Sequence, residues 1–138
     1  MNKTMTNNEL IITRNRLNDF IEKDKVTPGK ISYAITKNYK ALEEALDPLK
    51  TEQQKILKKI EEANNSDMSD EEKTEFTNKM NKSFEEILTT SVDVSIHMIS
   101  ENEIIDISGM SAKDYLALDF MIEKAEDEES KPVPTSVE

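Results

Sequence analysis

Residues 31–63 read ISYAITKNYKALEEALDPLKTEQQKILKKIEEA, and their pattern determines how the rest of the chain can be arranged. Residues of one set recur every seven positions, and a second set follows them at a spacing of four. The two sets are Ile35, Leu42, Leu49, Ile56 and Ala63, and Tyr39, Leu46, Gln53 and Ile60. This heptad repeat predicts a long helix with one apolar face. Thr27 and Pro28 supply a capping hydroxyl and a first-turn proline, so we expect the helix to span about 28–63.

Pro48 lies inside the heptad stripe. An interior proline removes one backbone hydrogen bond and clashes with the carbonyl four residues earlier, at a cost of about 3 kcal/mol. Asp47 before Pro48, or Thr51 three residues later, could instead cap a new helix, so two tightly joined helices are an alternative. Because the seven-residue register passes through Pro48 without slipping, we predict a single kinked helix.

Capping boxes mark the starts of three further helices. They are Thr6 with Glu9, Ser69 with Glu72, and Ser111 with Asp114, and they predict helices over about 7–23, 70–89 and 112–124. The helix over 70–89 has an apolar stripe made of Phe76, Met80, Phe84, Ile87 and Leu88. Such a stripe can close an antiparallel hairpin against the long helix.

Between the third and last helices the period of the pattern changes. Apolar and polar residues alternate in Val92, Asp93, Val94, Ser95, Ile96, His97 and Met98, as in a half-buried strand. Residues 100–103 are suited to a turn, and the run at 104–107 is apolar enough for a second strand. We therefore expect a two-stranded ribbon over about 92–107, packed on the helices because such a ribbon is marginal alone.

These elements predict one mainly α domain over residues 1–124. It is a helical hairpin or bundle built on one long kinked helix, with the small ribbon in its C-terminal third. Residues 125–138 combine a charge run with two prolines and predict a disordered acidic tail.

The charge of the chain is strongly asymmetric. Its 138 residues contain 29 Asp and Glu against 18 Lys and Arg, for a net charge of −11. Residues 1–63 hold 12 basic and 10 acidic residues, whereas residues 64–138 hold 6 and 19. A field of this sign repels nucleic-acid phosphate and attracts a basic protein partner. Solubility alone is the other explanation of the charge. The candidate acidic contact surface consists of Glu71, Glu72, Glu75, Glu85, Glu86, Asp93, Glu101, Glu103 and Asp106.

The composition lacks the parts of most catalytic sites. There is no cysteine for a thiolate nucleophile or a zinc–thiolate site, and two glycines cannot build a phosphate cradle. His97 is the only imidazole and has no assignable catalytic partner. Glu101, Glu103 and Asp106 lack the spacing of a calcium loop. We expect no enzymatic activity, no cofactor and no metal. The absence of a long apolar run and of a signal-peptide pattern predicts a cytoplasmic protein that does not enter a membrane.

The heptad stripe is also a candidate interaction or oligomer seam. Its residues are Ile35, Tyr39, Leu42, Leu46, Leu49, Gln53, Ile56 and Ile60. Gln53 interrupts it with a polar side chain, and one polar group in a seam can set register or oligomeric state. Two interpretations remain open, a homodimer through this seam and an intramolecular core with Gln53 at its rim.

Three stretches carry a resemblance to a known group of proteins. They are residues 9–17 (ELIITRNRL), residues 41–43 (ALE) at the end of a Lys-rich segment, and residues 116–123 (LALDFMIE). With them the chain resembles a family of small phage proteins of unknown function from low-GC Gram-positive hosts. The resemblance implies a phage origin and expression in the host cytoplasm, and it carries over no catalytic residue.

The resulting functional hypothesis is a non-enzymatic accessory protein that binds another protein. In a phage this means an assembly or virion accessory, or an inhibitor of a host or defence protein. The alternative is an acidic mimic of nucleic acid that blocks a nucleic-acid-binding protein, which requires carboxylates gathered on one face.

Overall fold

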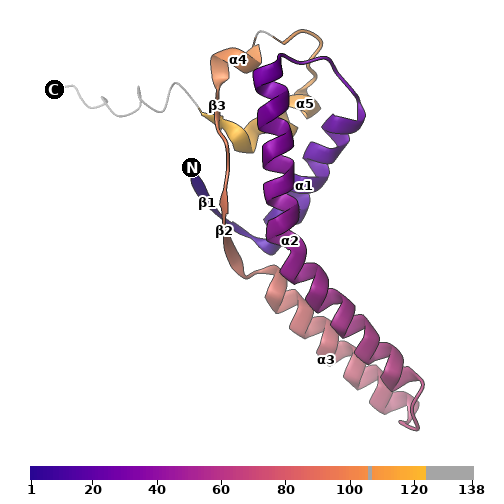
Figure 1. The fold of residues 1–138 in the computed structure, drawn as a ribbon. Helices are drawn as coiled ribbons and strands as arrows, with labels where there is room; N and C mark the ends of the chain where they lie inside the picture. Colours follow the sequence, from indigo (N-terminus) through magenta and orange to yellow (C-terminus); the bar gives the residue numbers. More distant parts are fainter. Residues whose placement is uncertain (106, 124–138) are drawn as a thin grey trace, which may run out of the picture.

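A computed structural model describes residues 1–105 and 107–123 of the chain, so Asp106 and the predicted tail over 125–138 lie outside the described residues. In chain order the elements are β1 (Asn2–Thr6), α1 (Asn7–Glu22), α2 (Gly29–Asn64), α3 (Asp70–Leu88), β2 (Ser91–Ser95), β3 (Ile99–Ser100), α4 (Glu101–Ile105), α5 (Ala112–Leu118), the 3-10 turn η1 (Asp119–Met121) and β4 (Ile122–Glu123). The predicted mainly helical fold with small strands is confirmed. Figure 1 shows a body from which α3 and the second half of α2 project.

The long helix α2 is continuous over 36 residues and contains Pro48. The prediction of one helix is therefore confirmed, and the alternative of two joined helices is wrong. Figure 1 shows the helix changing direction about half-way along, where it leaves the body. A proline ring inside a helix produces such a bend, because it displaces the carbonyl of the preceding turn.

All three predicted capping boxes form. At the start of α1, Glu9 N–H donates to Thr6 Oγ1 over 3.1 Å, and Thr6 N–H donates to Glu9 Oε1 over 2.8 Å. Ser69 with Glu72 and Ser111 with Asp114 repeat the arrangement. These side chains satisfy backbone donors that a helix N-terminus otherwise leaves without partners.

The predicted ribbon over 92–107 is wrong, because β2 pairs with the N-terminal strand β1. The two strands are antiparallel, with Asn2 opposite Ser95 and Thr6 opposite Ser91. The predicted second strand is instead the short helix α4. Ile104 and Ile107 are buried three residues apart, whereas Ile105 is 61% exposed, so this apolar run follows a helical rather than a strand period.

The last helix is shorter than predicted. It ends at Leu118, and η1 and β4 replace its expected continuation to residue 124. Ile122 there lies opposite Ile99 in a short parallel pair and is buried. Pairing with β3 therefore replaces the last helical turn.

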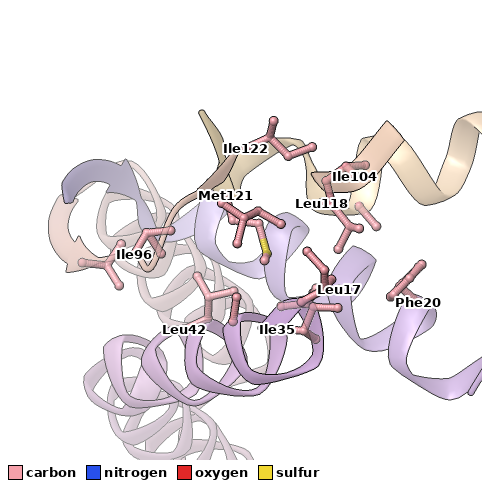
Figure 2. Packing of buried hydrophobic residues seen from close by; sticks show 14 of the residues in the cluster. Leu17, Phe20, Ile35, Leu42, Ile96, Ile104, Leu118, Met121 and Ile122 are labelled. Carbon is pink, nitrogen blue, oxygen red and sulfur yellow. The ribbon is translucent and has the colours of Figure 1, made fainter. Parts of the chain in front are cut away.

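The core of the body lies between α1, α2 and the C-terminal elements. Figure 2 shows its labelled side chains. Those of α1 and α2 (Leu17, Phe20, Ile35 and Leu42) lie opposite those of α4, α5, η1 and β4 (Ile104, Leu118, Met121 and Ile122), with Ile96 from the segment after β2 to one side. Asp114 joins α5 to the end of α1, because its buried carboxylate pairs with Lys23 Nζ at 2.5 Å and Lys25 Nζ at 3.7 Å. The hydrogen bond from Lys23 holds the pKa of Asp114 at about 2.

Asn38 clamps the segment between β2 and β3 onto α2. Its side chain is fully buried. Asn38 Oδ1 accepts from His97 N–H over 2.7 Å, and Asn38 Nδ2 donates to the His97 carbonyl over 2.9 Å and to Met121 Sδ over 3.4 Å. One amide thus satisfies both backbone groups of a residue that has no strand partner at that point.

Replacing Asn38 by Ala should lower the free energy of unfolding by about 2 kcal/mol, because the buried backbone groups of His97 lose their partners. Urea unfolding followed by far-UV circular dichroism measures the change. Asn81→Ala, at an exposed position of α3, is the matched control and should change stability little. Equal stability of the two variants would contradict the clamp.

Replacing Pro48 by Ala should raise the free energy of unfolding by up to about 3 kcal/mol, because residue 48 then donates to the Glu44 carbonyl in a helix that is already continuous. The control Pro28→Ala, at the N-cap of α2, should change stability by less than about 1 kcal/mol. A less stable Pro48→Ala variant would show that the packing of the chain requires the bend.

Candidate functional site

The part of the molecule that stands apart from the core is a helical hairpin, which we call the arm. It consists of residues 48–64 of α2, the connection over 65–69, and α3. Figure 1 shows its two helices side by side and antiparallel, projecting away from the strands and from α1, α4 and α5. The arm therefore offers side chains to solvent along most of its length.

The connection at the tip of the arm is held by its own polar groups. Ser66 Oγ donates to the Ala63 carbonyl over 2.6 Å and accepts from Met68 N–H over 3.2 Å. Asp70, Glu71 and Glu72 place carboxylates in the first turn of α3, where they interact favourably with the helix dipole. The local sequence is thus sufficient to reverse the chain.

Asn7 anchors the base of the arm to α1. Its buried side chain donates from Nδ2 to the Ile87 carbonyl over 2.9 Å, and its backbone N–H donates to the Thr90 carbonyl over 3.0 Å. These bonds satisfy carbonyls at and just beyond the end of α3, which the helix itself leaves open. The last turn of α3 is therefore fixed against the body.

A second brace crosses the bend at Pro48. Glu43 Oε2 lies 2.8 Å from Arg14 Nη1 of α1, and Glu43 Oε1 lies 2.8 Å from Lys50 Nζ in the first turn of the arm. Hydrogen bonds from Lys50 and then Arg14 lower the pKa of Glu43 from 4.5 to about 2. The neighbouring Tyr39 has a raised pKa, first because of burial and then because of the Glu43 charge. One carboxylate thus links α1, the body half of α2 and the arm.

The structure divides the predicted seam into two parts. The part that packs into the core, which includes Leu49 at the start of the arm, is intramolecular: Ile35, Leu42, Leu46 and Leu49 are buried, and Tyr39 packs half-buried against them. The part in the arm is accessible, since Gln53 is exposed and Ile56 and Ile60 are only half-buried. The accessible part of the seam therefore lies on the arm.

No residue of α3 is buried, although its apolar stripe faces α2. Phe76, Met80, Phe84, Ile87 and Leu88 are all half-buried. On α2, Leu57 is 58% exposed. An open hollow of about 500 Å³ runs beside Phe76 and is bordered by Glu75, Asn78, Lys79 and Lys82. Two helices cannot cover both sides of the seam between them, so apolar surface remains accessible along the arm.

The predicted acidic surface is not one surface among the described residues. Glu71, Glu75, Glu85 and Glu86 are exposed on α3, Glu72 caps that helix, and Lys73, Lys79 and Lys82 lie between them. Glu101 and Glu103 lie on α4, at the other end of the molecule (Figure 1). Glu103 pairs with Lys30 at 2.9 Å, and Asp93 accepts from Thr4 Oγ1 over 2.8 Å. The structure brings together only the carboxylates of α3.

His97 lies outside the arm. Its ring meets that of Tyr33 edge-on, with centroids 5.7 Å apart, and its backbone is held by Asn38. Within residues 1–105 and 107–123, no group of three or more His, Cys, Asp or Glu side chains is placed to hold a metal ion. A cavity between α1 and α5, lined in part by Phe20 and Leu116, measures about 60 Å³.

Sequence reasoning identified both helices of the arm but missed its accessible leucine. Leu57 lies outside the heptad stripe, and the heptad pattern identifies only the positions expected to be buried, so it does not identify Leu57. The signal that could have found it is the spacing of four residues between the seam residue Gln53 and Leu57, which places an apolar side chain beside the seam.

No family model, no curated protein and no solved structure matches this chain. The resemblance to small phage proteins therefore stays a hypothesis. None of the helices in the described part of the chain is both long and apolar enough to cross a bilayer.

Replacing Glu43 by Gln should flatten the pH dependence of stability in the acid range. The folded-state pKa of about 2 lies below the ordinary value of 4.5, so the stabilisation by Glu43 is present above about 4.5 and lost as the pH falls toward 2. Urea unfolding at pH 6, 4 and about 2.5 should show wild type more stable than Glu43→Gln at pH 6, with the difference shrinking on acidification. Glu44→Gln, at an exposed neighbouring position, is the control, and an unchanged difference across this pH range would contradict the brace.

Proposed function

We propose that this chain is a non-enzymatic accessory protein that acts by binding another protein through its arm. The observation that carries the proposal is that α3 has no buried residue along its 19 residues. Phe84, Ile87 and Leu88 pack against the body core, whereas Phe76 and Met80, further along the arm, are half-buried without contact to that core. Accessible apolar surface on a projecting element is typical of a contact site. The polar anchors Asn7 and Glu43 hold the arm in a defined orientation, which reduces the entropy lost on binding.

The hollow beside Phe76 is the part of the arm best suited to a protein partner. Phe76 borders it, together with side chains of both charge signs. Interfaces commonly combine an apolar centre with a polar rim. The phage setting, in which such a protein is an assembly or virion accessory or an inhibitor of a host or defence protein, is part of the same proposal, as is the cytoplasmic location.

The alternative of a nucleic-acid mimic has less support. It requires a continuous acidic face, whereas the carboxylates of α3 alternate with three lysines and those of α4 lie far from the arm. The mixed charges reduce the resemblance to a phosphate backbone.

Reversing the basic rim of the hollow should abolish partner capture. Tagged full-length chain, recovered from the cells that express it at low and high salt, should carry one stoichiometric protein. The affinity of the variant Lys79→Glu/Lys82→Glu for that protein should fall at least about tenfold, equivalent to about 1.4 kcal/mol. The control Lys37→Glu/Lys40→Glu reverses the same charge on the body half of α2 and should retain it.

Equal capture by both variants would contradict the proposal. Capture of a nucleic-acid-binding protein that is lost at high salt, and is unaffected by the arm variant, would support the mimic instead.

A further inference from the structure

The outer face of α1 borders a groove that is separate from the arm. A hollow of about 360 Å³ lies between α1, β1 and η1 and is lined in part by Met5, Ile12, Arg16 and Phe120. Arg16 also borders the smaller cavity between α1 and α5, so the two hollows adjoin at this residue. We call the two hollows together the α1 groove. Its wall includes an accessible apolar side chain, because Ile12 is 43% exposed.

The α1 groove is bordered by more cations than carboxylates, in a chain whose net charge is −11. Its charged residues are four cations, Lys3, Arg16, Lys23 and Lys113, and three carboxylates, Glu9, Asp19 and Asp114. The Asp114 carboxylate pairs with Lys23. The Glu9 carboxylate accepts from the N–H at the start of α1, in the capping box. Three cations then remain beside one carboxylate, that of Asp19.

The three remaining cations are accessible. Within residues 1–105 and 107–123, no carboxylate lies within ion-pair distance of Lys3, Arg16 or Lys113. Arg16 and Lys113 are exposed, and Lys3 is half-buried. Apolar walls such as Ile12 and Phe120 have a low dielectric constant and focus the field of charges in a cleft. The α1 groove is therefore suited to an acidic segment.

The last described strand ends beside this groove. Phe120 borders the groove, and β4 ends three positions later. Ile122 of β4 lies opposite Ile99, and three residues before Ile99 the Ile96 N–H donates to the Met1 carbonyl over 2.8 Å. The end of β4 and the start of the chain thus lie along one short stretch of backbone, as Figure 1 also shows. A segment that follows β4 therefore begins near β1 and the α1 groove.

We propose that the α1 groove binds the acidic run of this same chain, residues 126–129 (EDEE). The run has four successive carboxylates and begins three residues after β4. A chain spans at most about 3.6 Å per residue, so the run reaches about 11 to about 22 Å from the end of β4. Phe120 lies three residues before that end and borders the same hollow as Arg16, so this reach is sufficient. The carboxylates then meet the cations that lack a partner.

Attachment to the same chain favours this occupant over a separate acidic molecule. A segment and a site that are joined by a few residues meet at an effective concentration on the order of 1 mM. Contacts between exposed charges are individually weak and are screened by salt, so they depend on such a concentration. We therefore expect the contact at low ionic strength and its loss at high ionic strength. The inference concerns a surface other than the arm and does not rest on the proposed function.

Paramagnetic relaxation in the full-length chain tests the contact. The chain has no cysteine, so Ser130→Cys supplies a single attachment site for a nitroxide label directly after the acidic run. At low ionic strength the label should broaden the amide signals of Thr13 and Arg16, which border the groove on α1. The broadening should be lost at about 1 M NaCl, where the Debye length is about 3 Å.

Two variants distinguish binding from the proximity that attachment alone produces. Conversion of all four carboxylates of residues 126–129 to their amides leaves the body unchanged and should reduce the broadening to its high-salt level. Lys3→Glu/Arg16→Glu should have the same effect from the groove side. The matched control Lys37→Glu/Lys40→Glu reverses two exposed charges on α2 and should retain the broadening. Thermal unfolding of each variant confirms that the body is folded before its spectrum is interpreted.

Equal broadening in the amide variant and in the wild-type sequence would overturn the contact. So would a loss in the control as large as the loss in Lys3→Glu/Arg16→Glu. A labelled chain without broadening, whose Thr13 and Arg16 signals shift when a synthetic peptide of residues 124–138 is added, would also overturn it. That result would show a groove that binds acidic segments only from another molecule. Partner capture through the arm is measured separately, so it can succeed or fail independently of this contact.

Discussion

The continuity of α2 through Pro48 is the constraint on which the rest of the structure depends. The same helix contributes Ile31, Leu42 and Leu46 to the core of the body and then continues into solvent as one half of the arm. Because the backbone is not interrupted, the orientation of the arm follows from the packing of the body. The bend and the Glu43 brace then set where the arm leaves, so a surface remote from the core has a defined position.

Buried polar side chains supply the specificity that a small core lacks. Asn7 ties the end of α3 to the start of α1, Asn38 ties the segment after β2 to α2, and Asp114 ties α5 to the end of α1. Within the described residues, no buried side-chain nitrogen or oxygen lacks a hydrogen-bond partner. Such groups are costly to bury unpaired, so each one favours a single arrangement of its neighbours over other compact arrangements.

The sequence predicted what depends on local pattern and missed what depends on distant partners. Capping boxes and heptad spacing located α1, α2 and α3 to within about two residues. The strand β1 has the polar sequence NKTMT and no alternation to mark it, and it becomes a strand only because β2 lies beside it. Ile122 likewise reads as helical and pairs with Ile99 instead.

The candidate site likewise has one part that the local sequence pattern predicted and one part that it did not. The heptad repeat identified the arm half of the seam, at Gln53, Ile56 and Ile60. It could not show that the seam residues from Ile35 to Leu49 are buried in the core of the body, because that depends on α5 and η1 packing from the far end of the chain.

The pairing of β1 with β2 also has a consequence for folding. The two helices of the arm are close in sequence and can pair early, whereas Thr6 can pair with Ser91 only after most of the chain has been made. During synthesis the hairpin can therefore form first, and the N-terminal strand pairs only after residues 91–95 have been made, through a contact with a high loop-closure cost.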